Sequence, residues 1–183
     1  MLRLFVALAL PPELRSTVAG LAGGIPGAKW VPAENYHLTL RFIGEIEKWR
    51  AQEVDDALAA IRGNAFDLSL RGLGTFEKAG RINALWVGVE RNDTLTHLQN
   101  KVETALQRCG LAAERKRFSP HVTIARTDRA PAEKVVAYVQ AHNLFRAPPM
   151  RVEHFTLFSS RLGKEASVYT PEVEYDLGTR AAA

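Results

Sequence analysis

The stretches His37-Leu38-Thr39-Leu40 and His121-Val122-Thr123-Ile124 repeat one pattern of histidine, apolar residue, threonine and apolar residue. On a β-strand, successive side chains point to opposite faces of the sheet. Each stretch therefore places its histidine and threonine on one face and its two aliphatic residues on the other. The repetition predicts two similar strands, one in each half of the chain, that both present an imidazole and a hydroxyl group.

Two histidines on two such strands suit a reaction that takes up one proton and releases another. Imidazole is the side chain whose ordinary pKa lets it act as an acid or a base near neutral pH. We take His37 and His121 as the candidate catalytic residues, with Thr39 and Thr123 donating hydroxyl groups to whatever binds between them. Zinc requires three or four ligands, and no cysteine or carboxylate stands at ligand spacing near either motif, so no metal site is predicted.

Basic residues accompany both motifs. Arg41 stands at an even offset from His37, which predicts the same face and a contact with a phosphate or a base. Arg126 stands at an odd offset from His121, so it reaches that face only if the strand has ended or bulged. We take both arginines as candidate substrate-binding residues. The run Arg115-Lys116-Arg117 is either a solvated connector or a guide for an RNA backbone.

Bulk composition is typical of a globular protein with a sizeable core. The 183 residues are 46% hydrophobic and 24% charged, and we expect a single domain over residues 1–183. The net charge of +4 favours an anionic partner without identifying it as nucleic acid. A lone cysteine, Cys109, excludes an internal disulfide framework and fits a reducing cytoplasm.

Several classes of protein are disfavoured. No apolar run approaches the roughly 20 residues that span a bilayer, and the apolar residues 4–10 run directly into prolines, which indicates a strand and not a signal peptide. The glycines near Gly72 lack the spacing of phosphate-binding and dinucleotide-binding loops, so no cofactor is expected. We expect a cytoplasmic monomer with no membrane association and no obligate protein partner.

Strands and helices alternate along the chain, and glycines 72, 74 and 80 mark a loop between them. Asp93 is the expected N-cap of one helix, and the last three residues, Ala181–Ala183, are expected to fray. The order predicts an α+β fold whose two chain halves form facing lobes, with antiparallel sheets around a central cleft and helices outside. Strands are expected near residues 2–9, 36–43, 66–70, 84–89, 118–126, 152–159 and 167–175, and helices near 11–21, 46–61, 93–109 and 131–142.

The two motifs and their flanks resemble the two-histidine phosphoesterase superfamily, and within it the RNA 2′,3′-cyclic phosphodiesterases, also named for 2′-5′ RNA ligase activity. The matching segments are the opening Arg3-Leu4-Phe5-Val6-Ala7, the stretches Asn35 to Leu40 and Phe42 to Glu45, and Phe118 to Arg126. Arg41 departs from the family's pattern, which has a small or apolar residue there. The resemblance implies two pseudo-symmetric lobes around a basic cleft. It also implies opening of a 2′,3′-cyclic phosphate at an RNA 3′ end to a 2′-phosphomonoester, without metal or nucleotide.

These residues suit that chemistry. An in-line displacement at phosphorus needs a base for the attacking water, an acid for the leaving ribose oxygen, and donors for the phosphoryl oxygens. Our hypothesis makes His121 the proton acceptor and His37 the proton donor. Thr39, Thr123 and Arg126 then contact the phosphate. By microscopic reversibility, the same site would join a 2′,3′-cyclic phosphate to a 5′-hydroxyl.

Two alternatives stay open at this stage. One is a phosphodiesterase for another small cyclic phosphate, such as ADP-ribose 1″,2″-cyclic phosphate or a cyclic nucleotide. The other is a non-catalytic RNA-binding module, which the presence of both histidines and both threonines argues against. Among the aromatic residues, Trp30 and Phe42 fit a core position, and Trp30 has stacking on a base as its alternative.

Overall fold

A computed structural model describes residues 1–178, and the predicted frayed tail lies outside them. Every predicted helix is present, with its ends within two residues of those expected. The helices are α1 (Pro12–Ala19), α2 (Lys48–Ala59), α3 (Asp93–Arg108) and α4 (Ala132–His142), with a 3-10 turn at Ala33–Asn35. The strands are β1 (Leu2–Ala9), β2 (Lys29–Trp30), β3 (His37–Ile46), β4 (Phe66–Leu68), β5 (Leu70–Lys78), β6 (Arg81–Val89), β7 (His121–Arg126), β8 (Met150–Val152), β9 (His154–Leu162) and β10 (Ser167–Asp176).

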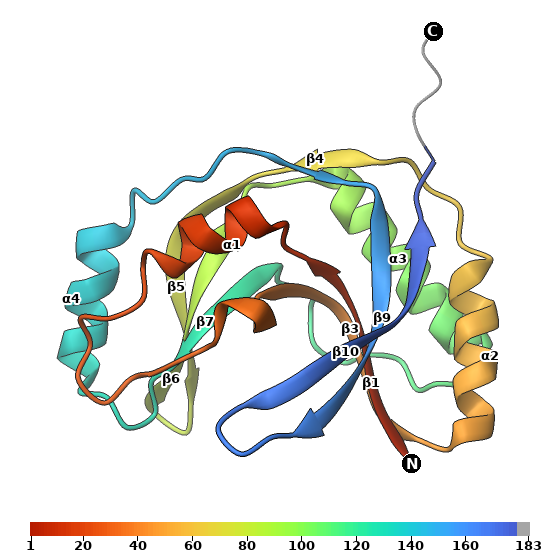
Figure 1. The fold of residues 1–183 in the computed structure, drawn as a ribbon, viewed down its shortest axis with the longest axis horizontal. Coiled ribbons are helices and arrows are strands. Elements are labelled where there is room, and N and C mark those ends of the chain that lie inside the picture. The colour runs from red at the N-terminus through yellow and green to blue at the C-terminus, as the bar shows by residue number, and fades with distance from the viewer. Residues whose placement is uncertain (179–183) are drawn as a thin grey trace, which may run out of the picture.

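Two antiparallel sheets form the body of the protein (Figure 1). The first has the strand order β10-β9-β1-β3 and carries the first histidine motif on β3. The second has the order β2-β7-β6-β5 and carries the second motif on β7. A separate short pair, β4 with β8, leads along the chain into β5 of the second sheet and β9 of the first. The predicted α+β architecture with two antiparallel sheets is therefore confirmed.

The lobes do not correspond to the two halves of the chain, and that part of the prediction is wrong. Strand β1 pairs with β3 on one side and with the late strand β9 on the other, so the first sheet uses both ends of the chain. The helices do not follow the chain halves either. Helix α3, from the second half, packs on β3 beside α2, whereas α4 packs on β5 and β6. Figure 1 shows α2 and α3 on one side of the molecule and α4 on the other. A sheet built from the first half alone would leave one edge of β1 unpaired.

The core lies between the sheets and their helices. Strand β1 is central in its sheet and is buried from Leu4 to Leu8. Its Leu4, Val6 and Leu8 join the main core, whereas Phe5 and Ala7 pack with Phe158 on the opposite face. That opposite face is the floor of the first lobe beneath its histidine. Within residues 1–178, no helix is long and apolar enough to cross a membrane.

Two local predictions are wrong. The stretch with Gly72 and Gly74 is part of strand β5 and not a loop, and Gly72, with a positive φ of 69°, lies where the pairing with β6 is irregular. Gly80 does lie in a turn, between β5 and β6. A Cβ at Gly74 would overlap the indole of Trp86 on the paired strand, so glycine there makes room for packing. The N-cap of α3 is Asn92 and not Asp93, since the Asn92 side chain accepts from the Leu95 amide at 3.0 Å.

Candidate active site

All four residues of the two motifs' polar faces line one cleft between the sheets. The cleft has a volume of about 450 Å³, and its walls include His37, Thr39, His121 and Thr123. Strand β3 supplies the first pair and β7 the second. The expected alternation of the motifs holds, because the aliphatic residues between and after the polar ones are buried in both strands.

His37 is fixed by a hydrogen bond and by aromatic packing. Its Nδ1 lies 2.7 Å from the carbonyl oxygen of Asn35, at the end of the 3-10 turn. A carbonyl oxygen only accepts, so Nδ1 donates, and Nε2 is the ring atom left for chemistry. Phe5 and Tyr169 pack around the ring, with centroids 5.0 and 5.2 Å from that of the imidazole.

His121 has a closely similar setting in the other lobe. Its Nδ1 donates to the carbonyl oxygen of Ser119 at 2.6 Å, which again leaves Nε2 available. Phe76 lies edge-on to the ring at a centroid separation of 4.7 Å, and Trp86 lies 6.0 Å away. In both lobes the acceptor is the carbonyl two residues before the histidine, and aromatic side chains hold the ring.

The cleft favours the neutral form of both imidazoles. Burial lowers the pKa of His37 below its ordinary value of 6.5, the Asn35 carbonyl acts in the opposite direction, and the charge of His121 lowers it further. Burial likewise lowers the pKa of His121, with the Ser119 carbonyl opposing and the Arg126 charge adding to the decrease. A neutral imidazole with a free Nε2 is a proton acceptor, and its protonated form is a proton donor.

A bulge in each strand decides which basic residue enters the cleft. In the β7–β6 pairing Trp86 opposes Thr123 and Leu85 opposes Ala125, so Ile124 is an extra residue. The extra residue reverses the alternation, because two consecutive side chains then face the core. Arg126 consequently lines the cleft although its offset from His121 is odd. The sequence predicts that Arg126 shares the face of His121 only if the strand has bulged or ended, and the bulge meets that condition.

The corresponding bulge in β3 removes Arg41 from the cleft, and the prediction that it shares the histidine face is wrong. In the β3–β1 pairing Ala7 opposes Thr39 and Val6 opposes Arg41, which makes Leu40 the extra residue. Arg41 therefore points behind the sheet, where its side chain is 7% exposed. Its even offset from the histidine would have kept it in the cleft only on a regular strand.

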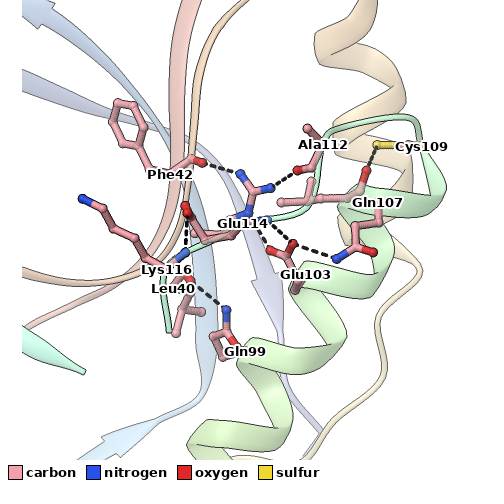
Figure 2. Close-up of polar contacts among 11 residues, drawn as sticks. Leu40, Phe42, Gln99, Glu103, Gln107, Cys109, Ala112, Glu114 and Lys116 are labelled. Carbon is pink, nitrogen blue, oxygen red and sulfur yellow. Dashed lines mark hydrogen bonds and ion pairs between the residues drawn. The ribbon is translucent and has the colours of Figure 1, made fainter. Parts of the chain in front are cut away.

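Behind the sheet, Arg41 is the centre of a polar network. Figure 2 shows its partners Glu103, Phe42 and Ala112 around it. Its Nε pairs with Glu103 of α3 at 2.5 Å, and its two terminal nitrogens donate to the carbonyl oxygens of Phe42 and Ala112. Glu103 also accepts from the Glu114 amide and from Gln107. Burial alone would raise the pKa of Glu103, but these hydrogen bonds outweigh burial and lower it. Arg41 thus joins β3, α3 and the connection that follows α3.

Some cleft residues escaped the sequence analysis. Phe42, expected in the core, is 45% exposed and lines the cleft, with the guanidinium of Arg3 over its ring at 5.4 Å from the centroid. Tyr169 and Asn83 also line the cleft, and neither stands near a motif. Trp30 packs against Tyr138 and is not among the lining residues. The bulge that brings Phe42 into the cleft leaves no signature in the sequence.

The lining is polar and cationic. It contains the two imidazoles, the two threonine hydroxyls, Arg3 and Arg126, and no aspartate or glutamate from residues 1–178. Paired acid–base groups beside fixed cations suit a reaction in which an anion gains negative charge in its transition state. A phosphodiester attacked by water is such an anion.

Comparison with known proteins identifies the family. Residues 10–164 match the family model described as the 2′-5′ RNA ligase superfamily. The chain belongs to this superfamily. It is 30% identical to the RNA 2′,3′-cyclic phosphodiesterase of Archaeoglobus fulgidus over 92% of this chain and 96% of that protein. It is 42% identical to the protein of the same name from Aeropyrum pernix, over 62% of this chain and 64% of that protein.

Solved structures agree with the family assignment. LigT of Escherichia coli, crystallised in complex with 3′-AMP, superimposes with a TM-score of 0.78 and 27% sequence identity. The match covers 96% of this chain and 98% of LigT. The likeness therefore extends over both lobes and the cleft between them, and confirms the two-histidine phosphoesterase fold.

Proposed function

We propose that this protein is an RNA 2′,3′-cyclic phosphodiesterase that converts the cyclic phosphate at an RNA 3′ end to a 2′-phosphomonoester. The observation that carries the proposal is the cleft itself. Two histidines from opposite sheets line it together with Arg3 and Arg126, and the Nε2 atom of each ring has no hydrogen bond to the described residues. The names of the relatives and the 3′-AMP bound to LigT support it.

In the proposed mechanism His121 accepts a proton from water through Nε2, and the water oxygen attacks phosphorus. The bond between phosphorus and the 3′ oxygen breaks, and protonated His37 delivers its Nε2 proton to that oxygen. The product carries a phosphate on the 2′ oxygen and a free 3′-hydroxyl group. Entering and leaving oxygens lie on opposite sides of phosphorus in an in-line displacement, which suits histidines that come from opposing strands.

The remaining cleft residues bind the substrate. Thr39 and Thr123 donate hydroxyl hydrogens to the phosphoryl oxygens, and Arg126 balances their charge. Phe42 forms an apolar wall against which a nucleobase can pack. With a 5′-hydroxyl in place of water as the nucleophile, the same displacement would form a 2′-5′ linkage.

The setting of the reaction is also part of the proposal. We expect the protein to act in the cytoplasm, as a monomer, without a metal, a cofactor or an obligate protein partner, and as one domain over residues 1–183. The single cysteine supports a reducing compartment. The pairing of β1 with β9 supports one folding unit, because the chain ends share a sheet.

The deciding experiment is incubation of the protein with a short RNA that ends in a 2′,3′-cyclic phosphate, in the presence of EDTA. Wild type should release a 2′-phosphate, identified against authentic 2′- and 3′-phosphate standards. His37→Ala and His121→Ala should each lower kcat by about 10³-fold, since each removes one proton transfer. Exchange of either histidine with a loss below tenfold, or a requirement for metal, would contradict the mechanism.

Product identity tests the finer assignment. A 3′-phosphate product would mean that the 2′ oxygen leaves, and the assumed orientation of the ribose would be wrong. Absence of any turnover by wild type would favour another cyclic phosphate or a binding role. ADP-ribose 1″,2″-cyclic phosphate and an RNA-binding titration distinguish those two alternatives.

A further inference from the structure

The connection between α3 and β7, residues 111–120, is held firmly against the first lobe although it leads to the second. Arg41 donates to the Ala112 carbonyl at 2.5 Å, and Glu103 accepts from the Glu114 amide at 2.9 Å. The Glu114 carboxylate turns back to accept from the Lys116 amide. All of these contacts use the backbone of the connection or Glu114, so the loop is fixed without its basic side chains (Figure 2).

Three consecutive cations of this loop are left on the surface. Arg115, Lys116 and Arg117 are all exposed. Within residues 1–178, none of the ion pairs involves any of the three. An anchored loop that presents three unpaired cations has already lost much of its backbone freedom, and this lowers the entropic cost of binding an anion.

The loop lies next to the catalytic cleft. Phe42 lines the cleft on one face of β3, the edge strand of its sheet. On the other face of β3, Arg41 and Ile43 line a second hollow of about 440 Å³ whose other wall runs from Leu111 to Lys116. Arg117 precedes His121 by only four residues. A fully extended chain covers about 3.6 Å per residue, so their Cα atoms lie within about 14 Å of each other.

We propose that Arg115, Lys116 and Arg117 bind the backbone phosphates of the RNA chain that precedes the 3′ end, while the end itself occupies the histidine cleft. The RNA would pass Phe42, cross the free edge of β3 and continue along the second hollow behind that strand. This inference rests on the proposed function for its substrate, and it adds that the enzyme distinguishes an RNA chain from a mononucleotide. Binding here is independent of base sequence, because it involves phosphates alone.

Salt dependence gives the expected size of the effect. Each phosphate neutralised on a single strand contributes about 0.7 to the slope of log affinity against log salt, so three contacts contribute a slope of about 2. The triple variant Arg115→Gln, Lys116→Gln, Arg117→Gln should lose that part of the slope. At 0.1 M salt, its Kd for a ten-nucleotide RNA ending in a 3′-phosphate should rise about tenfold by fluorescence anisotropy.

The matched control is Lys48→Gln, Arg91→Gln, Lys134→Gln, which removes the same charge from three exposed positions outside the cleft and the loop. It should bind the RNA as wild type does. In turnover, the preference is the ratio of kcat/KM for the oligonucleotide 2′,3′-cyclic phosphate to kcat/KM for cytidine 2′,3′-cyclic phosphate. This ratio should fall about tenfold in the loop variant and stay constant in the control.

An unchanged ratio and an unchanged salt slope in the loop variant would overturn the inference. So would an equal loss for both substrates, which would mean that the loop acts on His121 and not on RNA. The anisotropy measurement needs no turnover. If wild type failed to open any cyclic phosphate, the proposed function would fall, while the role of the loop would still be decided by RNA binding.

Discussion

Strands β3 and β7 begin with the same six-residue pattern of burial, yet they use it differently. In each, histidine and threonine face the cleft, the extra residue of a bulge follows, and the next two residues point first to the core and then to the cleft. In β3 those two residues are Arg41 and Phe42, and in β7 they are Ala125 and Arg126. The backbone is thus repeated, while the chemistry of the last two positions is exchanged.

Because of this difference, we propose different roles for the two lobes in substrate binding. In our proposal the first lobe offers an apolar wall at Phe42, and the second offers a fixed cation at Arg126. The core-facing position is a small packed alanine in β7, which is fully buried, and an ion-paired arginine in β3. A charge at that position needs the Glu103 carboxylate beside it, because an unpaired charge behind a sheet costs several kcal/mol. Arg41 therefore has a structural role, whereas Arg126 lines the cleft, where we propose that it binds substrate.

The largest expected effect comes from replacing Arg41, the core-facing residue of β3, by alanine, which is the residue that β7 has at the corresponding position. Arg41→Ala leaves the Glu103 carboxylate without its partner at 17% exposure and should lower the free energy of unfolding by about 3 kcal/mol. Urea denaturation measures the loss. Arg41→Ala combined with Glu103→Gln should recover at least half of it, because no buried charge is then left unpaired. A loss below 1 kcal/mol for the single variant would contradict this account.

Substitutions at the cleft-facing position, Phe42 in β3 and Arg126 in β7, should have different effects on kcat and on KM. Arg126→Ala should lower kcat about 100-fold, because it removes a fixed charge from the developing phosphorane. Phe42→Ala should leave kcat nearly unchanged and raise KM about tenfold, since stacking a base is worth about 1–3 kcal/mol. Steady-state kinetics with a nucleoside 2′,3′-cyclic phosphate measures both. Equal kcat effects from the two variants would show that the lobes do not divide the labour in this way.

The smallest expected effect is on the pH dependence. Both histidine pKa values lie below 6.5, so the bell-shaped profile of kcat/KM should peak below pH 6.5. Arg126 holds the pKa of His121 down by its charge, and Arg126→Gln should therefore move one limb of the profile to higher pH. The shift should be absent in Phe42→Ala, which removes no charge. A wild-type optimum above pH 7 would contradict the lowered pKa values.

The two histidine–threonine pairs of the cleft could be predicted from the sequence because their pattern is local. Alternation within four residues fixes the common face of His37 and Thr39, whatever the rest of the fold does. The four predicted helices are present for the same reason, because the spacing of apolar residues that indicates a helix lies within each helical segment. Arg41 and Arg126 lie beyond a bulge, which depends on how a neighbouring strand pairs. The sequence alone therefore does not determine which face of the sheet each arginine occupies, and the prediction for Arg41 is wrong.

The sequence by itself determined the two polar motifs, the family and the alternation of strands and helices. The tertiary structure alone decided that the lobes interleave, because β1 takes its second partner from the far end of the chain. It also decided that Phe42, Tyr169 and Asn83 line the cleft and that Arg41 does not. The physical reason is common to these cases. Strand pairing and bulges are set by contacts between residues far apart in the chain, and no local pattern records them.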